Sequence, residues 1–121
     1  MVLDSISDRW YSTSGSKTAN GSYQAVFAET VFDVKKVGRI SLQFINSGAA
    51  QQKIKVYVTL DVRTDSTLGD SRWTQIGDDV VVGATASSLK SISTTGLMYL
   101  GVTASGTSSQ VLDYNMLVQN L

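Results

Sequence analysis

Alternation of apolar and polar residues is the feature of this chain that most limits its fold. It is clearest over residues 53–63, where five aliphatic side chains occupy every second position. Successive side chains of a β-strand point to opposite faces, so the pattern predicts a strand with one buried face. The aliphatic positions of this segment are Ile54, Val56, Val58, Leu60 and Val62.

The same alternation recurs along the chain, around residues 40–44, 98–103 and 112–118. Residues 23–34 are rich in aromatic and β-branched types, which predicts one long or bent strand. Glycine-containing breakers separate these segments at roughly 8 to 12 residues, a spacing typical of a sandwich or barrel. No segment has a 3.6-residue apolar stripe with caps. We therefore expect an all-β fold, an antiparallel, jelly-roll-like β-sandwich of about eight strands with almost no helix.

The chain is the size of one domain, at 121 residues. We assign residues 21–121 to the sandwich. Residues 1–20 form either an N-terminal arm, since residues 12–16 are a Ser/Gly stretch, or a first edge strand. Asn20-Gly21 is the strongest turn signal, because both residues tolerate a positive φ, and it predicts a hairpin between residues 10–18 and the next strand.

The composition excludes most of the side chains that usually act in catalysis or bind transition metals. The chain has no His and no Cys, and hence no imidazole base, thiolate nucleophile or soft metal ligand. Its 29 Ser and Thr residues lack an obvious activating base. The one adjacent acidic pair, Asp78-Asp79, is best interpreted as a solvated bend. We expect no enzymatic activity and no cofactor.

Two charged segments have alternative interpretations. Asp61, Asp65 and Asp70 flank a polar loop that offers oxygen ligands for calcium, but an ordinary exposed loop is the favoured interpretation. Five cations form a second candidate group, either a nucleic-acid patch or, as we favour, solubilising charges. They are Lys35, Lys36, Arg39, Lys53 and Lys55.

The net charge of zero gives no reason to expect nucleic acid or a membrane as partner, and it favours association between copies. The chain also lacks proline, so its sheet edges need protection by charge, bulges or neighbouring subunits. No secretory signal is visible at the N-terminus, so we expect synthesis in a cytoplasm.

Large aromatic side chains are the candidate ligand contacts, because exposed Trp and Tyr rings on β-sandwiches stack on sugars. The candidates are Trp10, Tyr11, Tyr57 and Trp73. Packing against the core is the competing role, and for Trp73, at the head of a short strand, it is the favoured one.

Residues 39–118 carry an ordered series of motifs. A strand ends in Phe44-Ile45-Asn46-Ser47-Gly48, an alternating strand and a polar loop follow, and then come Trp73-Thr74-Gln75-Ile76-Gly77 and Ser93-Thr94-Thr95-Gly96-Leu97-Met98-Tyr99-Leu100. In this order the segment resembles small β-sandwich modules of tailed-phage virion proteins and of some bacterial surface proteins. The loop before Trp73 lacks the Asp-Gly turn often found there in such modules.

This resemblance implies a structural or adhesive role. We expect a virion protein, foremost a capsid decoration protein, that assembles as a homo-oligomer such as a trimer on major capsid or tail proteins. The alternative is a carbohydrate-binding or host-receptor-binding module of a tail or fibre, with a host-surface glycan as ligand.

Overall fold

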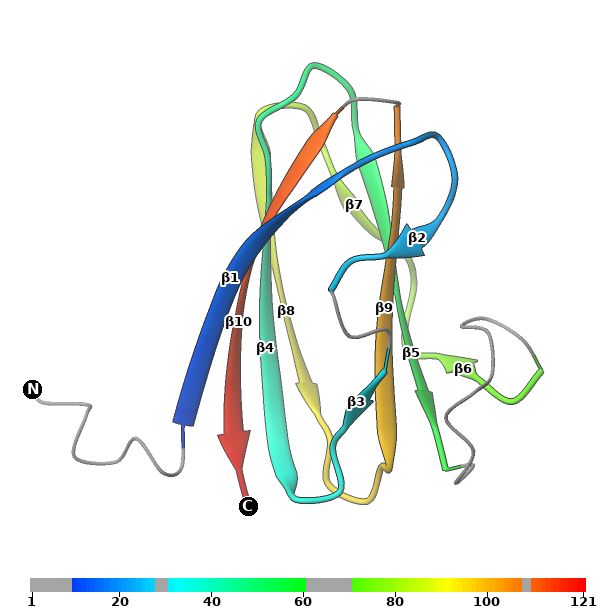
Figure 1. Cartoon of the computed structure of the whole chain (residues 1–121), viewed down its shortest axis with the longest axis vertical. Helices are drawn as coiled ribbons and strands as arrows, with labels where there is room; N and C mark the ends of the chain where they lie inside the picture. The colour runs from blue at the N-terminus through cyan, green and yellow to red at the C-terminus, as the bar shows by residue number, and fades with distance from the viewer. Residues whose placement is uncertain (1–9, 28–30, 61–70, 108–109) are drawn as a thin grey trace, which may run out of the picture.

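The computed structural model describes residues 10–27, 31–60, 71–107 and 110–121, and at residues 10 and 11 the backbone alone. Two antiparallel sheets pack face to face (Figure 1). No helix occurs among the described residues. The strands are β1 (Trp10–Thr18), β2 (Gln24–Ala25), β3 (Phe32–Asp33), β4 (Val37–Asn46), β5 (Gln52–Thr59), β6 (Thr74–Gln75), β7 (Val80–Val82), β8 (Ala86–Ser93), β9 (Tyr99–Gly106) and β10 (Val111–Asn120).

The strand order confirms the predicted jelly-roll-like sandwich. One sheet has the order β1-β10-β4-β8, and the other has β9 and β5 at its centre. β2 and β3 both pair with β9, and β6 and β7 both pair with β5. β2 and β3 together therefore fill one position of the sheet, and β6 and β7 fill another. The ten strands thus occupy the eight positions of a double-sheet jelly roll.

The core lies between the two sheets and follows from the alternation. On β4, Ile40, Leu42 and Phe44 are buried while the residues between them are half-buried. Because one face of each sheet is apolar, the two faces are removed from water together. Other buried members come from β5, β9 and β10, and they are Ile54, Val56, Val58, Leu100, Val102, Ala104, Leu112, Met116 and Val118.

The predicted hairpin at Asn20-Gly21 is wrong. β1 pairs along its whole length with β10, from Trp10 opposite Gln119 to Thr18 opposite Val111. Asn20 and Gly21 do form a turn, with φ of 90° at Gly21 and the Ser22 N–H donating to Asn20 Oδ1 at 3.0 Å. That turn carries the chain from one sheet to the other. A turn signal is local, whereas the partner of a strand is chosen by burial over the whole chain.

Two further expectations need correction. Residues 23–34 do not form one bent strand, because the described part of this segment holds the two short strands β2 and β3. The strand predicted over residues 53–63 ends at Thr59, and Leu60, expected on its apolar face, is 63% exposed.

The Ser/Gly stretch at residues 12–16 lies inside β1, an edge strand that pairs with β10. Residues 1–9 lie outside the described part, and the division of the chain at residue 20 stays a prediction. Gly15 sits opposite Tyr114, whose ring occupies the space that a Cβ at residue 15 would need.

Both edges of the four-stranded sheet carry a lysine of inward parity. Lys17 on β1 is opposite Leu112, and Lys90 on β8 is opposite Leu42. Directly opposite residues share a face, and both leucines are fully buried. An inward-pointing charge discourages another strand from extending the sheet. In this proline-free chain, the two edges of the four-stranded sheet are therefore protected by charge.

A buried asparagine forms several hydrogen bonds at the end of the sandwich where β4 is connected to β5. Asn46 is 0% exposed, and its Nδ2 donates to the carbonyl oxygens of Ala50 at 2.7 Å and of Val82 and Gly83 at 3.2 Å. Its Oδ1 accepts the Gly48 N–H at 3.0 Å. One side chain thus satisfies backbone groups of two loops, which explains the Asn-Ser-Gly motif physically.

We expect Asn46→Ala to lower the free energy of unfolding by about 2–3 kcal/mol, because it leaves several buried backbone groups without partners. The measurement is urea denaturation. Asn20→Ala is the matched control, since Asn20 also accepts the N–H two residues ahead but is exposed, and it should cost less than about 1 kcal/mol. Equal losses for the two variants would contradict the assigned role of Asn46.

Candidate interaction surfaces

The outer face of the β1-β10-β4-β8 sheet, here called the serine face, is formed by side chains of opposite parity to the core. Short hydroxyl side chains dominate it, with amides and a few aliphatic residues between them. Its members are Ser12, Ser14 and Ser16 of β1, Asp113, Asn115 and Leu117 of β10, Arg39, Ser41, Gln43 and Ile45 of β4, and Ser87, Leu89 and Ser91 of β8.

Charge is absent from the two central rows of the serine face. One row runs Ser12, Leu117, Ser41 and Ser91, and the next runs Ser14, Asn115, Gln43 and Leu89. The two charged members stand at opposite ends, Arg39 opposite Gln119 and Asp113 opposite Ile45. The face is therefore neutral at its centre and polarised at its ends.

Polar side chains of the serine face bond to one another. Asn115 Nδ2 donates to Gln43 Oε1 at 3.0 Å, and the hydroxyls of Ser41 and Ser91 lie 3.2 Å apart. At the charged ends, Arg39 Nη1 donates to Ser91 Oγ at 3.0 Å and Ser16 Oγ donates to Asp113 Oδ1 at 2.6 Å. Groups that already have partners cost less to remove from water.

The serine face has one prominent apolar side chain and one open hollow. Leu89 is 76% exposed, and beside it lies a shallow hollow of about 270 Å³ that Ser41, Gln43 and Asn115 help to line. Such a combination fits contact with another surface better than it fits enclosure of a small molecule.

The outer face of the opposite sheet is charged and aromatic. Lys55 Nζ lies 4.6 Å from the ring centre of Tyr23, and Lys35 Nζ lies 4.7 Å from that of Tyr99. Both are cation–π contacts, which hold the lysine side chains against the sheet. The two outer faces of the sandwich thus differ in chemistry.

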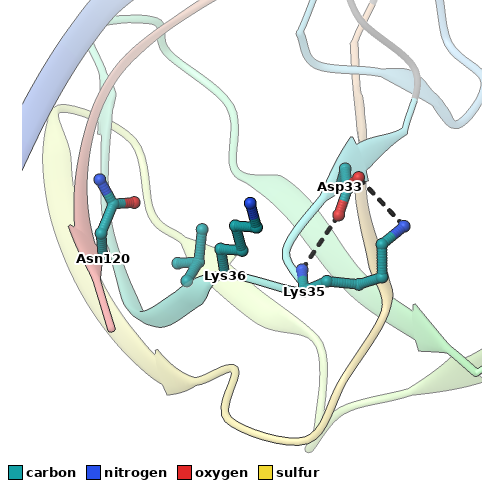
Figure 2. Close-up of a pocket in the computed structure, with 5 residues that line it drawn as sticks. Asp33, Lys35, Lys36 and Asn120 are labelled. Atoms are coloured by element: carbon teal, nitrogen blue, oxygen red, sulfur yellow. Dashed lines mark hydrogen bonds and ion pairs between the residues drawn. The ribbon is translucent and has the colours of Figure 1, made fainter.

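The turn from β3 to β4 forms a corner with an open cavity of about 420 Å³, lined by Asp33, Lys35, Lys36, Val37 and Asn120. Figure 2 shows Lys36 between the Asp33–Lys35 pair and Asn120, the last residue of β10. The Leu121 N–H donates to the Lys36 carbonyl at 2.9 Å. The end of the chain is therefore fixed to this corner.

Hydrogen bonds at the corner move two pKa values away from neutrality. The Lys35 N–H donates to Asp33 Oδ1 at 3.0 Å and, with the Lys35 ammonium 3.1 Å from Oδ2, lowers the pKa of Asp33. A hydrogen bond from Lys35 Nζ to the Tyr99 hydroxyl at 3.2 Å, and then the Asp33 carboxylate, raise the pKa of Lys35. Both groups stay charged near pH 7, so the pair is suited to a structural role and not to proton transfer.

The four aromatic residues predicted as ligand contacts are not brought together. Trp10 and Tyr11 lie in β1, opposite Gln119 and Val118. Tyr57 is half-buried on the outer face of the other sheet. Trp73 is 6% exposed, which leaves little of its ring for a sugar to stack on. Sugar binding itself stays a prediction.

The candidate charged groups are dispersed. Arg39 projects from the serine face, whereas Lys53 and Lys55 belong to β5 in the other sheet, so the five cations form no continuous patch. Asp79 accepts a hydrogen bond from Gln75 Nε2 at 2.7 Å, next to the exposed Asp78.

The aspartates at 61, 65 and 70 lie outside the described residues, so the calcium prediction is untested. In the described part of the chain, no three metal-binding side chains gather. A helix able to span a membrane is likewise not found in that part.

The serine face is the feature that the sequence interpretation missed. Its signal was present as Ser at every second position of residues 12–16, and as Ser87 and Ser91 on either side of Leu89, all opposite in parity to the core. Residues 12–16 were left with two interpretations, a flexible arm or part of a first edge strand, because the strand partner of these residues was not known.

Comparison with known proteins supports the fold alone. No model of a known protein family matches the chain, and no curated protein matches it in sequence. A structure of Bacillus endospore appendages, which form disulfide-linked pili, matches with a TM-score of 0.58 at 15% identity, covering 93% of this chain and 87% of that one. At this identity, the match shows a shared fold, and the strand order given above defines the class of that fold as a jelly-roll β-sandwich.

Two further solved structures have similar folds. The SPBc2 prophage-derived protein YomS has a TM-score of 0.54 at 15% identity, covering 91% of this chain and 95% of that one. PirA has a TM-score of 0.52 at 15% identity, covering 91% and 94%. These likenesses extend over nearly the whole of each chain.

An NMR titration tests the corner. We expect the Asp33 carboxyl to titrate below its ordinary value of 3.8 and, in Lys35→Met, to move only part of the way back, because the residue 35 N–H remains as a donor. Since the folded pKa is the lower one, any stabilisation from this pair is present above the unfolded pKa and is lost as pH falls through the folded value. Titration at 3.8 in both proteins would refute the arrangement.

Proposed function

We propose that this chain is a structural protein of a phage-type particle, made in the host cytoplasm and assembled as a homo-oligomer on the particle. The observation that carries the proposal is the serine face, a broad sheet surface with an uncharged centre and one highly exposed leucine, Leu89. Depletion of charge at the centre is a property of protein interfaces. A protein with such a face acts through contacts between large surfaces.

Two of the similar folds come from settings that agree with this proposal. One is encoded by a prophage, and another builds pili. The motif series over residues 39–118 resembles virion modules of tailed phages, and it adds support from the sequence side. Within this proposal we favour a capsid decoration protein bound to the major capsid protein, and we assign no catalytic activity to the chain.

The carbohydrate-binding alternative keeps one structural argument. Tyr57 lies on the same outer face as Tyr23, which is 41% exposed, and as Tyr99. Rows of tyrosines on a sheet supply ring faces on which sugars stack. A receptor-binding module of a tail or fibre would use this face and leave the serine face for assembly.

Particle composition tests the leading proposal. In particles purified on a density gradient from cultures of the source, we expect mass spectrometry to detect the chain in many copies, and immunogold electron microscopy to locate it on the head. Labelling of the tail would keep the structural role and exclude capsid decoration. Absence of the chain from the particles would refute the proposal.

A glycan array tests the alternative. If the outer face that carries Tyr57, Tyr23 and Tyr99 binds sugars, Tyr57→Ala should weaken binding by about 10-fold or more, because stacking on an aromatic ring is lost. Leu89→Ala is the control, since Leu89 lies on the opposite side of the sandwich and should leave binding unchanged. No binding by the natural protein, or equal binding by both variants, would reject this role for Tyr57.

A further inference from the structure

We propose that the serine face is a two-fold interface between two copies of this chain, packed face to face with their strands antiparallel. The inference deepens the proposed function and depends on it for the expectation of a homo-oligomer. It replaces a trimer with a pair as the unit of assembly. The distribution of charge, the protection of the sheet edges and the available area support this pairing.

Self-complementary charge selects a second copy as the occupant. Asp113 lies six residues from Gln119 along β10, and Gln119 is opposite Arg39, so the two charges stand about 20 Å apart. Neither forms an ion pair within the described residues, where the salt bridge found joins Asp33 and Lys35. When a second copy is turned end to end, its cationic end lies against the anionic end of the first copy, and the reverse holds at the other end.

The position of the charges fixes the two-fold axis. The midpoint between the levels of Arg39 and Asp113 is the level at which Leu42 pairs with Met116. An axis across the strands at that level, between the two faces, exchanges the ends of the sheet. Arg39 of each copy then faces Asp113 of the other, and both contacts form at once, as a two-fold interface requires.

The edges of the sheet favour this face over strand addition. β1 and β8 could extend the sheet into a neighbouring copy, but Lys17 and Lys90 place inward charges on both edges. The outer face of the other sheet carries Lys53 and Lys55, which such an interface would have to desolvate. The serine face has neither obstacle, because no lysine belongs to it.

The available area is sufficient for a modest interface. Four strands about 4.8 Å apart and about eight residues long cover roughly 500 Å² on each copy. Two copies would bury about 1,000 Å², near the lower limit for a specific interface. Leu89, which is 76% exposed, is the most exposed apolar side chain among the members of the serine face that pairing would cover.

Sedimentation equilibrium of the purified full chain tests the interface. We expect a species of twice the 13.0 kDa chain mass. Leu89→Lys should weaken pairing by about 30-fold or more, because it puts an unpaired charge into one of the two uncharged rows of the serine face. Val81→Lys is the matched control, since Val81 is 51% exposed on the opposite sheet and should leave the dissociation constant unchanged.

A charge exchange tests the two-fold arrangement. Arg39→Glu and Asp113→Lys should each weaken pairing by about 10-fold or more, because like charges then face each other. The double variant should recover most of the affinity. Residues 39 and 113 are about 20 Å apart in one chain, so recovery reports a contact between copies.

Four outcomes would overturn the inference: a monomer at about millimolar concentration, the mass of three copies, equal effects of Leu89→Lys and Val81→Lys, or a double variant no tighter than the single ones. These outcomes are separate from those of the particle experiment. A monomeric chain that is still found in particles would reject the serine face as a dimer interface and leave the proposed function standing. If the chain dimerises and the variants weaken the dimer as expected, but the chain is absent from particles, the dimer interface would stand and the proposed function would be rejected.

Discussion

Packing between the inner faces of the two sheets is the contact on which the rest of this structure depends. Phe44 and Leu42 are fully buried, and burial of a side chain of this kind contributes about 1.5–3 kcal/mol. With no cysteine in the chain, no disulfide assists this core. β10 lies between β1 and β4, so pairing between the two ends of the chain completes the sheet that covers one side of this core.

That constraint also determines what remains on the outside. Each strand of the four-stranded sheet gives one parity to the core, and the other parity is left to solvent. On β1 and β8 the outward positions hold mainly serine, so the outer surface is flat and nearly uncharged. The opposite sheet holds lysines and tyrosines in cation–π contacts. Under the proposed function, the serine face serves assembly and the charged, aromatic face is left to solvent or to a ligand.

Much of the fold was predictable because alternation is a local signal. The strands around Leu42, Val56 and Met116 were located from spacing alone, and those three side chains are buried, although Leu60 at the predicted end of the second strand is exposed. The Asn20-Gly21 turn was also located, but the strand it was expected to pair was wrong, because β1 finds its partner at the far end of the chain. The site was less predictable. Trp73 is buried, and the serine face became visible only after the strand order had placed four separate segments side by side.

The sequence by itself determined the class of fold, the apolar positions of the central strands and the lack of His- or Cys-based chemistry, since these follow from side-chain type and from a period of two. Only the tertiary structure decided which strands are neighbours. It showed that β2 and β3 share one position of the jelly roll, that β6 and β7 share another, and that Arg39 and Asp113 stand at opposite ends of one face. The physical reason is that strand pairing is non-local. Alternation states which side of a strand is buried, but only the competition among all strands for one core states which strand lies beside it.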